Sequence, residues 1–427
     1  MRLRRRIKII AICTFAGLGL LNIFRVATSL VLPTVFQKDF IQEYLIARAV
    51  IVGLPPYDPL PTLALRIFGN LPNQVFPHPS AHPPPMIILA LPFALLNYRL
   101  ATILWFLLGL FCLLEVSWLL VRRYFQSQSL LLPVLLSVGL CASYPFFLDL
   151  GLGQIMLPIL LPLTAGWLAI RSNKAALAGS LLALPLSMKY MGWPLVPFLA
   201  WRKQWRSLFW ACGVWVSVNL IGIAFAGVRQ SLKCYLHVAP SVSLMFRAEF
   251  LNFSTWSLGY RLFAGTSADF LWGFNAPPLL DFPSVATYAS FLVTAGVVLV
   301  ALVLAHNTRK LEHGCAVLIC ASTIVNPLSW HNYLVLLLIP ASVVVKVLAA
   351  RSFPLRLTLV AVLIGLMIVS PSPERLVGFT VHNSRSTVPA PVALISFLPL
   401  AAALALMLFV WYLTRIGDEE LPSAPVE

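Results

Sequence analysis

The sequence predicts an all-α polytopic membrane protein. Of its 427 residues, 60% are hydrophobic and only 10% are charged, whereas about a quarter of the residues in a soluble domain carry a charge. Many apolar runs approach the roughly 20 residues that a helix needs to cross a bilayer. These runs lack the short alternating pattern of membrane-spanning β-strands, so we expect helices throughout.

The charged residues indicate how the chain is oriented. There are 30 basic and 14 acidic residues, a net charge of +16 that would suggest nucleic acid binding in a soluble protein. Here the basic residues lie mainly at the ends of apolar runs, so they mark topology and no nucleic acid partner is expected. Residues 1–8 are strongly basic, which predicts a cytoplasmic N-terminus. A signal peptide also begins this way, but the apolar run at 9–32 is long for one and has no clear cleavage site.

The first polar region after that run is a proline-rich outer loop at 33–83. Within it, residues 39–52 have helical composition, because Phe40, Tyr44, Ala47 and Ile51 recur every three or four positions. We expect a short helix lying along the membrane surface, ended by the Gly and Pro residues that follow it.

The remaining apolar runs predict the other spans. The run at 85–97 is short and bounded by prolines, so it is expected to cross only partly, and the run at 176–200 is predicted to form two shorter helices that meet near Lys189 at the outer surface. The others lie at 100–121, 130–148, 152–170, 207–227, 285–305, 314–326, 333–349, 357–371 and 391–413.

The whole pattern predicts ten to twelve transmembrane helices with both termini in the cytoplasm, in a plasma or inner membrane. They form a single multi-span domain over 1–415, with a second outer loop at 228–284 and a short acidic cytoplasmic tail at 416–427.

Metal and nucleotide sites are not predicted. The seven cysteines form no CxxC pair and lie almost entirely in apolar runs, as buried thiols do. His78 and His82 have the spacing of a helical metal pair, but the prolines around them prevent a helix. The sequence has no GxxxxGK[ST] motif and no GxGxxG after a strand, so we expect no cofactor and no direct use of a soluble nucleotide.

Asp39 is the leading candidate for acid–base chemistry, with two interpretations open. Asp39 with Gln42 fits a capping box, worth about 1 kcal/mol, and a cap is the simpler interpretation of the spacing. A carboxylate fixed at a helix start can also act as a base. The acids expected on the outer side are Asp39, Glu43, Asp58, Asp149, Glu249, Asp269, Asp281 and Glu374.

Three other polar features each have a structural alternative. Residues 326–333, which include Trp330 and His331, gather hydrogen-bonding groups but also resemble an interfacial aromatic belt. Lys189 either snorkels to the surface or meets an anionic lipid phosphate. Gly151 to Gln154 are equally consistent with simple helix punctuation.

Taken together, these residues resemble the polytopic C-type glycosyltransferases (GT-C), and specifically glycosyltransferase family 87, which includes polyprenyl-phosphomannose-dependent α-(1,2)-mannosyltransferases. The motifs follow the family's order, although His82 replaces a tyrosine and Tyr190 replaces a proline of its pattern. The matching motifs are Asp39-Phe40 with Tyr44, Ala47, Gly53, Pro56 and Tyr57; Pro83-Pro84-Pro85; Gly153-Gln154; Lys189 followed by basic Arg202 to Arg206; Asn252-Phe253-Ser254; and Asn326-Pro327 to His331-Asn332-Tyr333.

The resemblance implies a GT-C fold and an inverting transfer of a sugar, such as mannose or another hexose. The sugar would pass from a polyprenyl-phosphate donor to a hydroxyl of a glycolipid or glycan acceptor at the extracytoplasmic face. Asp39 would be the general base. Lys189 and His331 would stabilise the leaving phosphate, and Tyr44, Tyr57, Gln154 and Trp330 would contact the substrates.

Two alternatives belong to other classes of protein. A transporter or flippase of lipid-linked or anionic substrates would place ionisable groups near the middle of the membrane, often within inverted repeats. The polar groups here concentrate in outer loops, and only one broken segment is found, which favours the enzyme. An inactive relative that scaffolds an envelope complex would tolerate replacement of Asp39.

Overall fold

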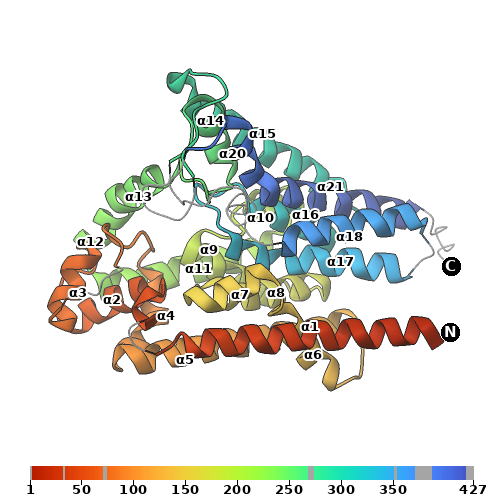
Figure 1. Ribbon diagram of the computed structural model, residues 1–427, viewed down its shortest axis with the longest axis horizontal. Coiled ribbons are helices and arrows are strands. Elements are labelled where there is room, and N and C mark those ends of the chain that lie inside the picture. The colour runs from red at the N-terminus through yellow and green to blue at the C-terminus, as the bar shows by residue number, and fades with distance from the viewer. Residues whose placement is uncertain are drawn as a thin grey trace. The chain divides into compact units, whose positions relative to one another are not determined.

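The computed structural model describes residues 2–31, 34–70, 75–267, 274–350, 353–370 and 387–419, with the backbone alone at 2–8 and 417–419. Nearly all of these residues are helical, and the β-structure among them is confined to isolated bridges (Figure 1). The prediction of an all-α protein is confirmed. Asp269, Glu374 and tail residues 420–427 lie outside the described residues.

Several helices are long and apolar enough to cross a membrane, which confirms a polytopic membrane protein. Within the described residues there are six, or seven if one bent pair counts as a span. Shorter apolar helices of 10–17 residues accompany them, and the predicted ten to twelve crossings would need these as well, so that number stays a prediction. The long helices are Ile9–Thr28, Tyr98–Tyr124, Trp205–Ala226, Pro283–His306, His331–Ala350 and Ala390–Ile416.

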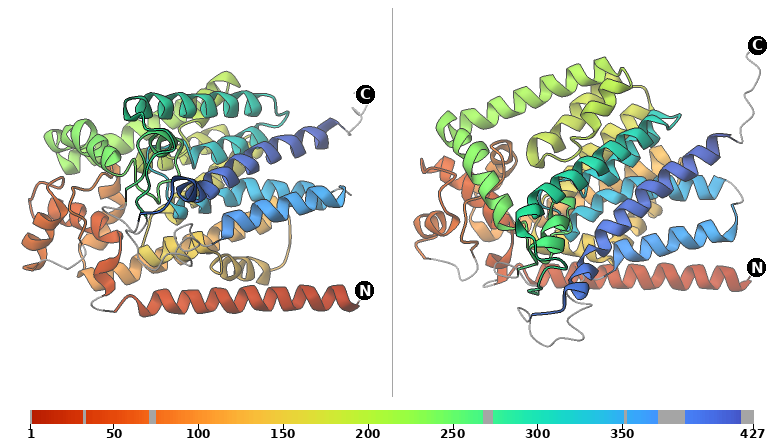
Figure 2. Two further views of the ribbon diagram at one scale, coloured as in Figure 1. Left: turned by 45° about the horizontal axis from the view of Figure 1, so that its top comes forward. Right: turned by 90° about the horizontal axis from the view of Figure 1, so that it is seen from above.

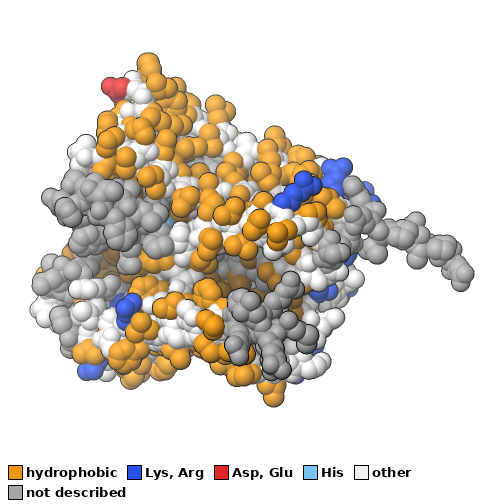
Figure 3. Space-filling model, turned by 45° about the vertical axis from the view of Figure 1, so that its right-hand side comes forward, with side chains coloured by type: hydrophobic (Ala, Val, Ile, Leu, Met, Phe, Trp, Pro, Cys, Tyr) orange, Lys and Arg blue, Asp and Glu red, His pale blue; other side chains and the backbone are white. Residues whose placement is uncertain are grey.

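Lipid-facing surfaces explain why so many apolar side chains remain exposed. Phe209, Tyr288 and Leu355 are each more than 70% exposed, and they lie on helices α11, α15 and α18, whose bounds follow below. Figure 3 shows one face of the molecule, on which hydrophobic side chains cover much of the described surface and Lys and Arg are few. In water such a surface would aggregate, whereas hydrocarbon is its natural solvent.

The described structure divides into two compact units. The first unit contains residues 1–165, 180–190 and 210–245, and the second contains 166–179, 191–209 and 246–427. The predicted single membrane domain over 1–415 stays a prediction.

In the first unit, α1 packs against α6 and α7, while α5 packs against α4, α6 and α7 (Figures 1 and 2). Helix α2 packs against α3, α4 and α5. The helices with residues in this unit are α1 (Arg2–Thr28), α2 (Phe40–Ile51), α3 (Leu60–Phe68), α4 (Pro85–Ala94), α5 (Tyr98–Leu119), α6 (Leu131–Leu140), α7 (Tyr144–Leu152), α8 (Met156–Arg171), α9 (Ala175–Lys189), α11 (Trp205–Ala226), α12 (Val228–Lys233) and α13 (Ala239–Met245).

The loop at 33–83, whose outer location stays a prediction, contains the predicted helix, α2, together with α3, which the sequence did not indicate. The surroundings of α2 differ from the prediction of a helix lying along the membrane. Most of its residues are buried on several faces, because Phe40 stacks on Trp105 at 4.5 Å and Tyr44 packs edge-on to Tyr98 at 5.0 Å. Helix α2 is therefore enclosed by protein, which holds Asp39 firmly.

Two breaks shape the helices near Asp39. The predicted span at 130–148 is in fact the pair α6 and α7, bent by 82° at residues 141–143. The predicted break near Lys189 is confirmed, since α9 ends there and α10 (Leu195–Trp201) follows, with Tyr190 at φ +56° and Gly192 at φ +81°. Both breaks bring polar backbone and side chains to the ends of apolar helices.

In the second unit, α16 packs against α15, α17 and α21, and α18 packs against α21 (Figure 2). A 3₁₀ segment, His331–Leu337, leads into α17. Parts of α8, α9 and α11 belong here, together with α10, α14 (Thr255–Phe263), α15 (Pro283–His306), α16 (Leu311–Ser322), α17 (Leu338–Ala350), α18 (Leu355–Val369), α20 (Ala390–Ala393) and α21 (Leu398–Glu419).

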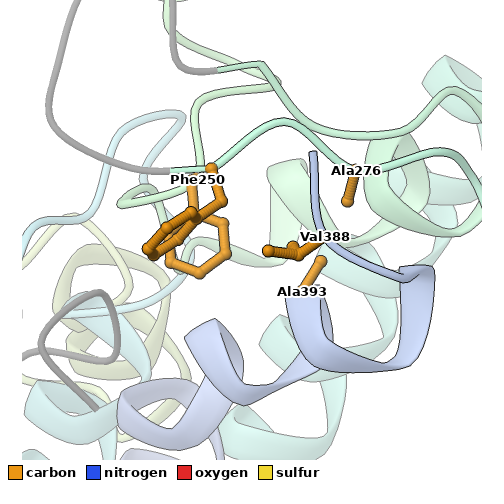
Figure 4. Close-up of a cluster of buried hydrophobic side chains, with 5 residues drawn as sticks. Phe250, Ala276, Val388 and Ala393 are labelled. Atoms are coloured by element: carbon orange, nitrogen blue, oxygen red, sulfur yellow. The ribbon is translucent and has the colours of Figure 1, made fainter. Parts of the chain in front are cut away.

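A buried cluster joins the loop at 228–284 to the start of the last helices. Phe250, Phe274, Ala276, Val388 and Ala393 pack together, with the two phenyl rings edge to face at 5.4 Å (Figure 4). This loop, predicted at 228–284, contains α12, α13 and α14 and is more helical than the sequence indicated.

Candidate active site

Asp39 stands at the N-cap position of α2 but does not cap it. Its backbone is helical, at φ −64° and ψ −23°, and its side chain makes no capping hydrogen bond. An N-cap residue normally has an extended backbone that turns its side chain toward the first N–H groups. The predicted capping box is therefore wrong, and the carboxylate is available for other partners.

The carboxylate of Asp39 accepts a hydrogen bond from Nε2 of Gln154. The backbone beside it is fixed too, because Asp39 N donates to Leu152 O at 2.7 Å. Lys38 Nζ donates to Gly151 O at 2.5 Å and to Ser29 Oγ at 2.6 Å. Residues 38–39 are thus bound to the last turn of α7, to Gln154 just after it and to Ser29 after α1.

Gly153 gives that turn its shape. It has φ +67°, which favours glycine, and an added Cβ would lie 3.1 Å from Cβ of Phe40. Trp105 Nε1 donates to its carbonyl at 2.8 Å. The buried Asp149 carboxylate accepts from the N–H groups of Met156 and Leu157, both at 3.2 Å, and so caps α8. The glycine turn both ends α7 and directs Gln154 to Asp39, so the two interpretations of residues 151–154 are compatible.

Lys189 completes a chain of three polar side chains. Its Nζ donates to Oε1 of Gln154 at 3.2 Å, at the end of α9. The amide of Gln154 thus gives its N–H to a carboxylate and its oxygen to an ammonium group. Asp39 and Gln154 are 115 positions apart in the sequence and Gln154 and Lys189 are 35 apart, and the fold joins all three.

Burial and neighbouring charged and polar groups set the pKa of Asp39. Burial raises its pKa to about 6, and the Glu43 charge also raises it, while the Gln154 hydrogen bond and the charges of Lys189 and Lys38 lower it. The carboxyl is therefore mostly ionised at neutral pH. Burial lowers the pKa of Lys38 to about 8, against the opposing effect of Asp39.

Tyr44 and Tyr57 brace the loop rather than contact Asp39. Tyr44 is almost fully buried and its hydroxyl donates to Leu96 O at 2.8 Å. Tyr57 is completely buried and its hydroxyl donates to His82 O at 3.0 Å. Their predicted contact with a sugar stays a prediction, and both hydroxyls already have partners.

The sequence did not reveal that Glu43 lies against His82. Nδ1 of His82 lies 2.9 Å from Oε1 of Glu43. The only available signal was that Glu43 lies one helical turn after Asp39 and shares its face.

Two motifs meet in the second unit. Asn252 Nδ2 donates to Pro327 O at 3.1 Å, and Ser329 N donates to Asn252 Oδ1 at 3.0 Å. The neighbouring aromatic groups are also packed, with Trp330 6.1 Å from Phe246 and His331 5.6 Å from Phe253 between ring centres. The predicted roles of Trp330 and His331 toward substrate stay predictions.

The fold and the polar chain define a multi-pass membrane protein with a carboxylate, an amide and an ammonium group gathered at helix ends. The model of glycosyltransferase family 87 matches residues 81–328, and the chain belongs to this family. It is therefore a membrane glycosyltransferase, as the sequence motifs predicted. The match includes Gln154, Lys189 and Asn252 and begins after Asp39. A comparison with curated proteins finds no match.

Proposed function

We propose that this glycosyltransferase moves a sugar from a polyprenyl-phosphate donor to an acceptor hydroxyl, with Asp39 as general base. The observation that carries the proposal is the chain from Asp39 through Gln154 to Lys189. It supplies a proton acceptor and a cation at a fixed separation, and these are the groups that the two halves of the reaction need.

The acceptor half of the reaction concerns Asp39. Its carboxylate takes the proton of the acceptor hydroxyl while the oxygen attacks the anomeric carbon of the donor. Such a positioned base contributes about 10²- to 10⁴-fold. Because the attack comes opposite the leaving group, the configuration at that carbon inverts.

The donor half concerns the leaving phosphate. The bond between the anomeric carbon and the phosphate oxygen breaks, and polyprenyl phosphate departs with the electron pair. The growing negative charge needs a cation or hydrogen-bond donor. Lys189 is the group proposed for this role, and its place at the end of an apolar helix suits a donor whose head is anionic and whose tail is hydrocarbon.

The membrane context completes the proposal. Placing the basic N-terminus in the cytoplasm puts the loop that carries Asp39 on the extracytoplasmic side of a plasma or inner membrane. A hexose such as mannose is the proposed sugar, and a glycolipid or glycan the proposed acceptor.

The test uses the full-length protein in lipid nanodiscs with a panel of radiolabelled polyprenyl-phosphate sugars and simple glycoside acceptors. We expect one donor to give a labelled product that Asp39→Asn does not form. The matched control is Asp58→Asn, which removes a partly exposed carboxylate of the same loop that pairs with Lys233 at 3.2 Å. Equal product from Asp39→Asn and wild type would refute the base assignment. In proteoliposomes, movement of intact donor across the bilayer with no product would favour a flippase.

A further inference from the structure

A buried histidine–carboxylate pair lies beside Asp39 and has no part in the chain described above. Oε1 of Glu43 and Nδ1 of His82 are 2.9 Å apart, with side chains 2% and 14% exposed. Two lone pairs would repel at this distance, so one of the two atoms carries a proton, which we assign to Nδ1. The contact lacks the alignment of a hydrogen bond and is therefore mainly electrostatic.

Stability alone does not account for this pair. Oε2 of Glu43 is buried and makes no hydrogen bond with the described residues. A buried carboxylate with a free oxygen costs free energy, and apolar side chains of the same size would often be as stable. A buried polar atom without a partner, such as Oε2 of Glu43, is a candidate for contact with a ligand.

The backbone of His82 is held on both sides, and its ring extends from this fixed point to Glu43. Its carbonyl accepts from Tyr57 Oη at 3.0 Å and from Cys234 Sγ at 3.5 Å, and its backbone N donates to Ser80 Oγ at 3.4 Å. With Nδ1 facing Glu43, the other ring nitrogen, Nε2, receives no hydrogen bond from the described residues. Nε2 is therefore the ring nitrogen left for a ligand. A carboxylate beside one nitrogen of a histidine sets the tautomer of the ring in this way.

Glu43, one member of the pair, lies on the same face of α2 as Asp39. Asp39 and Glu43 are one helical turn apart, a spacing that puts their Cβ atoms about 6 Å from each other. The charge of Glu43 also raises the pKa of Asp39. Its contact with Glu43 places His82 beside the face of α2 that carries Asp39.

We propose that His82, oriented by Glu43, binds a hydroxyl of the acceptor sugar; this rests on the proposed function. A sugar hydroxyl both donates and accepts, so it fits Nε2 whether the ring is neutral or charged, whereas a phosphate fits only the charged ring. The anionic donor also has its own cation at Lys189, linked to Asp39 through Gln154. Hydroxyl recognition by a fixed polar group gives strong discrimination, because a missing hydroxyl leaves a buried group unpaired.

The test compares His82→Tyr with His82→Phe, which have nearly the same size and differ by one hydroxyl. Binding of a panel of p-nitrophenyl glycosides is measured in nanodiscs without donor, and binding of short-chain polyprenyl-phosphate sugars is measured separately. We expect His82→Phe to bind the glycoside at least tenfold more weakly than His82→Tyr, with unchanged donor binding. Glu43→Gln should weaken glycoside binding in the same direction, and Asp58→Asn should not.

Several results would overturn this inference. One is that His82→Phe binds the glycoside as tightly as wild type does. A second is that the His82 variants lose donor binding and keep glycoside binding. A third is that wild type binds no glycoside. Binding needs no turnover, so a failure of the proposed function is seen separately. It would appear as glycoside binding that depends on His82 without a labelled product from any donor.

Discussion

Replacing Gln154 with leucine tests whether Asp39 acts as an ionised base. The substitution removes the N–H that Asp39 accepts and keeps a side chain of similar size. A hydrogen bond to a charged group is worth about 1.5–3 kcal/mol, and about 1.36 kcal/mol corresponds to one pKa unit. The pKa of Asp39, about 6 in the wild type, should therefore rise to about 7 or 8.

The direction of the change in the pH–rate profile follows from the protonation state in which Asp39 is active. A general base acts when deprotonated, so the rate rises with pH through the pKa of Asp39 and then levels off. In Gln154→Leu the rise moves to higher pH, which lowers turnover about tenfold near pH 6.5 and much less near pH 9.

The assay is turnover at saturating substrates from pH 5.5 to 9.5 in nanodiscs. Lys189→Met is the matched comparison, because the charge of Lys189 lowers the pKa of Asp39 less than the Gln154 hydrogen bond does. We expect a smaller displacement of the profile there, together with weaker donor use. A Gln154→Leu profile that rises at the wild-type pH would refute the reasoning.

Three further outcomes are expected from thermal unfolding of the detergent-solubilised protein. Asp39→Asn should unfold no earlier than wild type at pH 7.5. The raised pKa of Asp39 means that its ionised form destabilises the folded state, in full above about pH 6, and Asn removes that charge. Marked destabilisation of the variant would contradict this. Asn252→Ala should lower the unfolding temperature strongly. It removes hydrogen bonds to two carbonyl oxygens and from two N–H groups, each worth about 1 kcal/mol. The control Asn307→Ala, at an exposed position, should leave the unfolding temperature unchanged. Gly259→Ala places a Cβ 2.4 Å from Ala286 O and should cost about 1–3 kcal/mol, while Gly296→Ala meets no atom within 4 Å; equal unfolding of these two would contradict the close packing.

The sequence predicted most of the fold because apolar length and helix-breaking residues act locally. The break after Lys189 and the start of α2 near Phe40 needed only the residues around them. The 82° bend between α6 and α7 was missed because residues 130–148 form one apolar run. Burial of α2 was missed for another reason, since it depends on aromatic partners such as Trp105 far along the chain.

The sequence predicted which residues belong to the candidate site but not which of them contact one another. Asp39, Gln154 and Lys189 were each named from the sequence, yet no periodicity relates positions so far apart. The pairing of Glu43 with His82 was missed because prolines hide any regular spacing between the loop and α2. The capping box failed since it depends on the backbone angles of a single residue, Asp39.

The order of the polar residues along the chain has a consequence for biosynthesis. Lys38, Asp39, Gln154 and Lys189 all precede residue 190, so the ribosome has made every member of this cluster before it translates α14 or α21. Proteins of this size generally fold from the N-terminus during synthesis. The carboxylate can thus be hydrogen-bonded by Gln154 and stabilised by the charge of Lys189 while the later helices are still entering the translocon. A nascent chain halted before residue 189 would hold Asp39 without its cation.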